Sequence, residues 1–193
     1  MIYNNGMENR AYQGETPEQR LLRLQINPPI EAMETLLNSI DTHFNNEIRV
    51  TIAGDNYQTS LLFLGIHAVA LTIAEAFWNQ SGPMGYKKFV EEYMDGETSD
   101  KKFSKIADLI HKWRNVIAHQ WIGSVGHEIG YDYEMSYGWE ARDGVTLINP
   151  KIYCKSYLKA FSAGGKIWDY PSLFPESEME EIKNRIIQKY QAH

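Results

Sequence analysis

The residues best suited to chemistry lie in one short segment of the sequence, residues 112–121. This segment places Arg114 directly before Asn115, and His119 follows after three further residues. Histidine exchanges protons near neutral pH, and arginine keeps its charge and forms paired hydrogen bonds with phosphate oxygens. Attack of a ribose 2′-hydroxyl on the adjacent phosphorus needs a base, an acid and positive charge near the phosphate. The segment therefore supplies the groups that metal-independent RNA cleavage requires.

A helix must position these residues, because apolar side chains recur at helical spacing from about residue 99 onward. On that helix Arg114 and His119 lie about 140° apart and flank one face. The face between them carries small residues such as Ala118, which predicts close approach of a second helix and hence a homodimer. The opposite arc is apolar and consists of Phe103, Ile106, Ile110, Trp113, Ile117 and Trp121.

Other polar residues share this face of the predicted helix. Asn115 lies about 40° from His119, so its amide is expected to orient the imidazole or to bind a phosphate oxygen. A hydrogen bond across an interface is the alternative role for Asn115. His111, one turn earlier, is a candidate substrate ligand, and a solvated surface histidine is the simpler interpretation. Lys112 adds positive charge beside them and is a further candidate for substrate binding.

Two ionisable residues, His67 and Glu75, interrupt the most apolar run, residues 61–78, which lies in a predicted helix over about residues 57–79. A buried carboxylate at Glu75 would need a partner, and Arg114 is one candidate, which would make Glu75 an orienting residue. The alternative is that Glu75 ends its helix in solvent. His67 is predicted to be a hydrogen-bonded core residue rather than a catalyst. These two residues also argue against a membrane span, so the stretch is expected to form a buried core helix.

The pattern Arg-Asn-x-x-x-His near the end of a helix resembles the signature of the HEPN superfamily. The resemblance covers the motif and a helical frame over about residues 15–121. It implies a mainly α fold, a homodimer, and a metal-independent endoribonuclease that has Arg114, Asn115 and His119 as catalytic residues and needs no cofactor. One subgroup has a tyrosine two residues after the histidine, which a partner nucleotidyltransferase modifies. Trp121 stands at this position, which argues against that regulation.

The charge of the chain is unevenly distributed. The net charge is −6, which argues against broad, non-specific affinity for nucleic acid. Residues 101–121 nevertheless carry five lysines and arginines against Asp108 alone, a net of +4, which leaves −10 for the rest of the chain. The basic patch coincides with the motif helix. The acidic remainder favours a rival function, a non-catalytic HEPN-like module that binds a nucleotide or a protein partner.

Metal and disulfide chemistry are not expected. His111, His119 and His127 recur every eight residues, but glycines after Trp121 end the helix before His127. No cysteine or carboxylate pattern supports a metal site. The single Cys154 indicates a buried thiol in a reducing, cytoplasmic compartment, and no secretory signal opens the chain.

The remaining pattern predicts a single domain with a flexible tail. Residues 1–14 form the tail, and residues 15–193 form a helical bundle with an inserted hairpin. The bundle covers about residues 15–122, with a helix start at Thr16-Pro17 and another helix opened by Asn149-Pro150. The hairpin covers about residues 127–149 and turns at Asp143-Gly144. The C-terminal helices cover about residues 150–193.

The hairpin segment carries a strict two-residue alternation, which predicts a strand over residues 129–141 with a break near 136–138. Aromatic residues gather on one side of it: Tyr131, Tyr133, Tyr137 and Trp139. Such a stripe could stack bases, but carboxylates on its other side would repel phosphate. We interpret the stripe as the packing side of the hairpin, against the C-terminal helices or a partner chain.

The function that these patterns favour is RNA cleavage by 2′-hydroxyl attack, in a toxin–antitoxin or phage-defence system as the resemblance implies, with RNA and a protein antitoxin as partners. Besides the binding module, a second rival remains open, in which the chain is a scaffold or antitoxin-like protein. In that case Arg114 pairs with a core carboxylate and His119 caps the C-terminal end of its helix. The environments of these two side chains discriminate between the alternatives.

Overall fold

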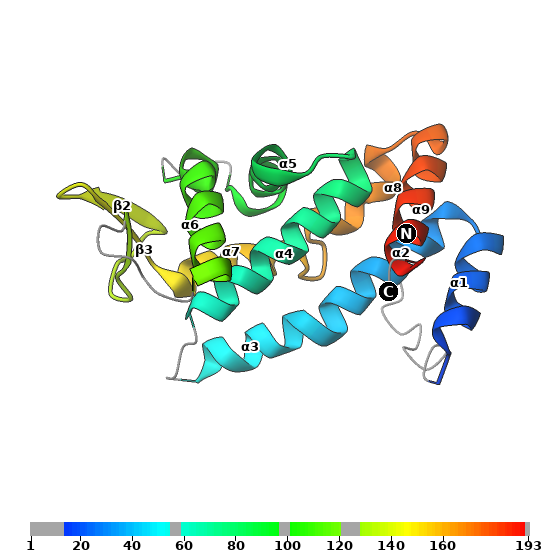
Figure 1. Cartoon of the computed structure of the whole chain (residues 1–193), viewed down its shortest axis with the longest axis horizontal. Helices are drawn as coiled ribbons and strands as arrows, with labels where there is room; N and C mark the ends of the chain where they lie inside the picture. The colour runs from blue at the N-terminus through cyan, green and yellow to red at the C-terminus, as the bar shows by residue number, and fades with distance from the viewer. Residues whose placement is uncertain (1–13, 55–58, 97–100, 121–127, 192–193) are drawn as a thin grey trace.

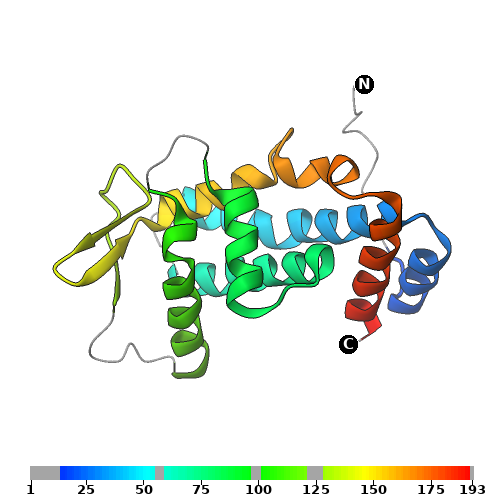
Figure 2. The ribbon, with the colours of Figure 1, turned by 90° about the horizontal axis from the view of Figure 1, so that it is seen from above.

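The computed structural model describes residues 14–54, 59–96, 101–120 and 128–191. They form a mainly helical fold with one small sheet. Figures 1 and 2 show an elongated molecule, with the sheet at one end and the N- and C-terminal helices α1 and α9 at the other. The mainly helical architecture predicted from the sequence is confirmed.

The N-terminal helices follow the sequence signals closely. Helix α1 (Pro17–Ile26) begins with a capping box in which Thr16 and Gln19 each bond the other's backbone N–H. Helix α2 (Pro29–Ser39) continues without a break through a π-helical turn over Ile40–Asn45 into α3 (Asn46–Ala53). The π turn inserts one residue per turn and so rotates α3 relative to the apolar stripe of α2.

Helix α4 (Thr59–Trp78) is the central element of the core. It is long and apolar enough to cross a membrane, but half of that apolar stretch is buried within the fold. It contacts helices α5, α6, α7 and α9. At its C-terminal end the Arg185 guanidinium donates to the carbonyls of Ala76 at 2.7 Å and Phe77 at 3.3 Å. A side chain from α9 therefore satisfies backbone acceptors that a helix end leaves unpaired.

The segment after α4 leads to the motif helix. Helix α5 (Gly82–Phe89) ends in a π turn over Val90–Met94. A 3-10 turn over Phe103–Ile106 then opens α6 (Ala107–Gln120), later than the start near residue 99 expected from the sequence. Residues 97–100, where the helix was expected to begin, and the glycines expected to end it lie outside the described residues.

The sheet differs from the predicted hairpin. Strands β2 (Trp139–Arg142) and β3 (Val145–Ile148) do form a hairpin, and Asp143 and Gly144 have the positive φ angles of its tight turn. Strand β1 (Ile129–Tyr131), however, pairs parallel to β3 on its other edge. The break expected near residues 136–138 is present but wider, because the whole segment 132–138 separates β1 from β2.

Asn149 explains the wider interruption between β1 and β2. Its Nδ2 donates to the carbonyls of Tyr133 at 3.2 Å and Met135 at 2.7 Å, which holds this loop away from the sheet. Its Oδ1 also accepts from two backbone N–H groups at the start of α7. One side chain thus fixes both the loop and the next helix. The remaining helices are α7 (Pro150–Ala160), α8 (Tyr170–Leu173) and α9 (Glu176–Gln191).

Candidate functional site

Helix α6 lies between the sheet and helices α4 and α5, as both views of the ribbon show (Figures 1 and 2). Its predicted apolar arc is confirmed for the described residues. Trp113 is half-buried and meets Phe63 of α4 and Tyr131 of β1 edge to face, at centroid distances of 5.4 and 5.6 Å. Trp121 lies outside the described residues. The buried members of the arc are Phe103, Ile106, Ile110 and Ile117.

Contacts on α4 and α6 also correct the expected position of the aromatic stripe. Tyr131 packs on Phe63 at a centroid distance of 5.8 Å, and the indole N–H of Trp139 donates to the carbonyl of Lys102 at 3.0 Å. The Tyr133 hydroxyl is hydrogen-bonded to Thr59 at the start of α4. The stripe therefore holds the sheet to α4 and to the chain just before α6, rather than to the C-terminal helices.

Arg114 is half-buried and bonds to its neighbour in the chain. Its Nη1 donates to Oδ1 of Asn115 over 2.6 Å. Among the described residues no carboxylate lies within ion-pairing distance of Arg114. A half-buried guanidinium without a carboxylate leaves most of its five N–H donors for other acceptors. The core ion pair expected in the scaffold alternative is therefore absent from this part of the chain.

The bond between Arg114 and Asn115 fixes the direction of the asparagine amide. A guanidinium has no acceptor atom, so the atom that faces Arg114 must be the amide oxygen. The amide nitrogen of Asn115 then points away from Arg114 with both of its hydrogens. Arg114 and Asn115 together form a group of hydrogen-bond donors, which suits an anion.

His119 belongs to the last turn of α6, but its side chain lies outside the described part of the structure. The site expected from Arg114 and His119 together is therefore described on the arginine side only. Ala118, the small residue expected on the dimer face, is exposed. The exposure of Ala118 leaves the face beside Arg114 open for a second helix.

A pair of histidines lies deeper in the fold beside Arg114. His67 of α4 is fully buried and stacks on the ring of Tyr86 at a centroid distance of 4.3 Å. Its Nε2 lies 2.9 Å from Nδ1 of His111, which is half-buried on α6. The prediction that His67 is a hydrogen-bonded core residue is confirmed. The interpretation of His111 as a solvated surface residue is wrong, because α4 supplies a partner for it.

The surroundings of both imidazoles lower their pKa values, which favours the neutral forms. Burial, the positive charge of Arg114 and the neighbouring His111 lower the pKa of His67 to about 3. Burial and the charge of Arg114 also lower the pKa of His111, although Asp108 opposes the shift. Burial disfavours the charged form of a base, and a nearby like charge adds to this effect.

The lowered pKa of His67 predicts that the protein loses stability as the pH falls below about 6.5. The folded pKa of His67 lies below the unfolded value, so the unfolded chain binds more protons between about pH 3 and 6.5. The contribution of neutral His67 to the free energy of unfolding is complete above this pH range. Within the range it declines by about 1.4 kcal/mol per pH unit as the pH falls. Between about pH 6.5 and 5, urea unfolding should show a loss of about 2 kcal/mol that a His67→Gln variant lacks. Equal slopes for the two proteins would contradict the neutral, buried state of His67.

Of the two roles expected for Glu75, the structure is closer to a side chain that lies partly in solvent near the end of its helix. Its carboxylate pairs with Nζ of Lys189 in α9 at 2.5 Å, and the side chain is about two-fifths exposed. The expected pairing with Arg114 is therefore wrong, because α9 covers this side of α4 and brings its own cation. Lys112 is exposed and lies 3.5 Å from Glu128, so its charge is partly compensated at the surface.

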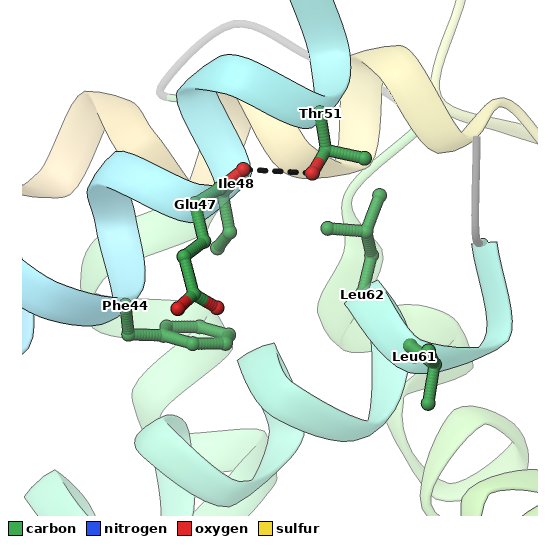
Figure 3. A pocket seen from close by; sticks show the side chains of 6 residues that line it. All are labelled: Phe44, Glu47, Ile48, Thr51, Leu61 and Leu62. Atoms are coloured by element: carbon green, nitrogen blue, oxygen red, sulfur yellow. Dashed lines mark hydrogen bonds between the residues drawn. The ribbon is translucent and has the colours of Figure 1, made fainter. Parts of the chain in front are cut away.

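Two other features of the fold lie apart from the motif helix. A pocket between α3 and α4 is lined by apolar side chains, with Glu47 as its single ionisable group (Figure 3). The Thr51 hydroxyl points toward this pocket but donates to the Glu47 carbonyl at 2.7 Å. Burial raises the pKa of the Cys154 thiol to about 12, so this thiol is not a nucleophile at neutral pH and has the buried role predicted for it. Neither feature includes a residue of the motif helix.

Sequence reasoning missed the partnership between His67 and His111. A histidine inside a very apolar helix is a signal that a hydrogen-bond partner must come from another element. The sequence does not say which element, because His111 lies 44 residues further along the chain. Comparison with known protein families, with curated proteins and with solved structures finds no match to this chain.

Proposed function

We propose that this protein is a HEPN-like, metal-independent endoribonuclease that acts as a homodimer with its site on helix α6. The main support for the proposal is the environment of the Arg114 side chain. It is half-buried, bonds to the amide oxygen of Asn115, and has no carboxylate partner among the described residues. Keeping such a cation without a counter-ion costs desolvation energy that a bound phosphate would offset.

The proposed reaction breaks one phosphodiester bond of RNA. The 2′-oxygen attacks the adjacent phosphorus, a new P–O2′ bond forms, and the P–O5′ bond breaks. His119 of one protomer removes the 2′-hydroxyl proton, and the partner's His119 donates a proton to the leaving 5′-oxygen. Arg114 and the amide nitrogen of Asn115 stabilise the charge on the non-bridging oxygens. The products are a 2′,3′-cyclic phosphate and a 5′-hydroxyl.

A test of this chemistry uses substrate and cofactor dependence. Cleavage of a panel of RNAs should continue in EDTA, because every proposed group belongs to the protein. After a cut site has been mapped, a 2′-deoxy nucleotide at that position should lower cleavage below detection, since the 2′-oxygen is the nucleophile. Gel analysis of end groups should show the cyclic phosphate.

A 2′-deoxy nucleotide placed several positions from the cut is the matched control and should leave cleavage unchanged. Cutting of all-DNA strands, or complete loss of activity in EDTA, would rule out the mechanism.

The rival function is a binding module that holds a nucleotide through the same donors without cleaving RNA. The net charge of −10 outside residues 101–121 favours this rival, because an acidic surface repels long nucleic acids. The binding module would be identified if the protein cleaves no RNA of the panel but binds a nucleotide with an affinity that depends on Arg114.

A further inference from the structure

We propose that His111 is a third ligand of the phosphodiester at this site, and that buried His67 fixes it as a neutral Nε2–H donor. This inference deepens the proposed function and rests on it for the identity of the ligand. It begins from the contact of 2.9 Å between Nε2 of His67 and Nδ1 of His111. A hydrogen bond at this distance needs one of these nitrogens to donate and the other to accept.

The direction of the bond follows from the other nitrogen of His67. Nδ1 of His67 is buried and meets no hydrogen-bond partner among the described residues. A buried N–H without an acceptor is rarer and more costly than an acceptor without a donor. Nδ1 of His67 is therefore the unprotonated nitrogen, and its Nε2–H donates to His111.

The tautomer of His111 is thereby determined. Its Nδ1 accepts the bond from His67, so its single proton resides on Nε2. A neutral imidazole in this form cannot accept a proton at Nε2, so His111 is not the general base. It can donate a hydrogen bond without adding a charge, as neutral imidazoles do toward oxyanions in other enzymes.

The position of His111 places this donor beside the other two. Arg114 and Asn115 follow it by three and four residues on α6, and residues at these spacings are surface neighbours on a helix. Arg114 is also near enough for its positive charge to lower the pKa of both histidines. Asp108, the acidic group that acts on His111, lies one turn earlier and is exposed. The donors of Arg114, Asn115 and His111 can therefore meet one phosphate group.

His67 is a positioning residue in this arrangement. It is anchored by its burial and by the stack on Tyr86 of α5, so its Nε2 is held in place. A ring locked in this way restricts both the orientation and the tautomer of His111, as outer hydrogen bonds do for histidines that bind metals.

The first experiment measures the tautomer directly in the wild-type protein, so it needs no variant and no RNA. Long-range ¹H–¹⁵N spectra of the histidine rings at neutral pH should show His111 protonated on Nε2 and His67 also protonated on Nε2. Titration with inorganic phosphate should shift the His111 Nε2 resonance together with the Arg114 guanidinium resonances. A proton on Nδ1 of His111 would overturn the inference. So would a phosphate titration that shifts the Arg114 resonances but leaves the His111 Nε2 resonance unchanged.

Two variants then test the role of His67. His67→Gln keeps an amide donor that can reach Nδ1 of His111, whereas His67→Leu removes the donor. His67→Leu should release the orientation of His111 and weaken phosphate binding by about tenfold, the effect of losing one orienting hydrogen bond. His67→Gln should retain most of the wild-type affinity and the Nε2–H form of His111. Equal phosphate affinity in the wild type and His67→Leu would refute the positioning role.

These measurements separate the two proposals. If phosphate shifts His111 as expected but the protein cleaves no RNA, the anion site stands and the ribonuclease assignment fails. If RNA cleavage depends on Arg114 while His111 carries its proton on Nδ1, the ribonuclease assignment stands and the inference about His111 fails.

Discussion

Replacement of Arg114 by alanine is expected to lower the rate of RNA cleavage by about 10²–10³-fold, the usual cost of removing one group that stabilises charge in a transition state. His119→Ala should lower it by about 10²–10⁴-fold, because it removes proton transfer. The free energy of unfolding should change by less than about 2 kcal/mol for Arg114→Ala, since its one described bond is to a neighbouring side chain. Single-turnover cleavage and urea unfolding measure the two effects.

Asn115→Asp provides a sharper test at the residue next to Arg114. An aspartate there would place a carboxylate against Arg114 and convert the donor group into an ion pair. Stability should stay the same or rise by about 0.5 kcal/mol, while cleavage should fall by about 10²-fold because the phosphate now meets a negative charge. Loss of activity with retained stability separates a site residue from a scaffold residue.

Arg142→Ala is the matched control for Arg114→Ala. Arg142 is an exposed arginine of β2, and it already pairs with Glu140 at 2.8 Å. Its removal should change the cleavage rate by less than about twofold, as expected for a surface ion pair. If Arg114→Ala cleaves RNA at the wild-type rate, the proposed site is refuted. If Arg114→Ala is largely unfolded, the scaffold alternative is favoured.

Ala118→Trp is expected to give a folded monomer that no longer cleaves RNA. Ala118 is exposed in the last turn of α6, so a large side chain should be tolerated within one chain. In the proposed dimer the same side chain would stand between two closely packed helices and push the copies apart. Light scattering after size exclusion measures the mass, and circular dichroism verifies the helical fold.

Ala53→Trp is the control for a bulky residue at an exposed helix end. Ala53 is the exposed last residue of α3, on a different element, and its variant should remain dimeric and active. A monomeric wild-type protein would remove the basis for a site with two histidines. A dimeric, active Ala118→Trp protein would place the interface on another surface.

Local patterns in the sequence were sufficient for most of the helical frame. Thr16 and Gln19 form the capping box that their spacing predicts, and Asp143-Gly144 makes the expected turn. The apolar arc of α6 is buried as the helical period requires. These features depend on residues within a few positions of one another, so a short window of sequence contains the information for them.

The order of the strands in the sheet could not be predicted from the sequence and is known only from the tertiary structure. Two-residue alternation is a property of the local backbone and predicts extended chain in the segment that begins at Ile129. It does not say which edge of β3 the first strand joins. Residues far apart in the chain meet at this end of the fold: β1 pairs parallel to β3, Asn149 bonds the loop before β2, and a Cβ at Gly138 would come within 2.6 Å of the Phe103 ring.

The sequence by itself determined which residues could do chemistry on α6 and that they share one helical face. The tertiary structure decided the partners of the candidate residues: Lys189 for Glu75, Asn115 for Arg114, and His67 for His111. The physical reason is that a hydrogen bond or ion pair between elements forms only where two helix faces meet. That meeting is set by the packing of α4 with α5, α6 and α9, to which residues far apart in the chain contribute together.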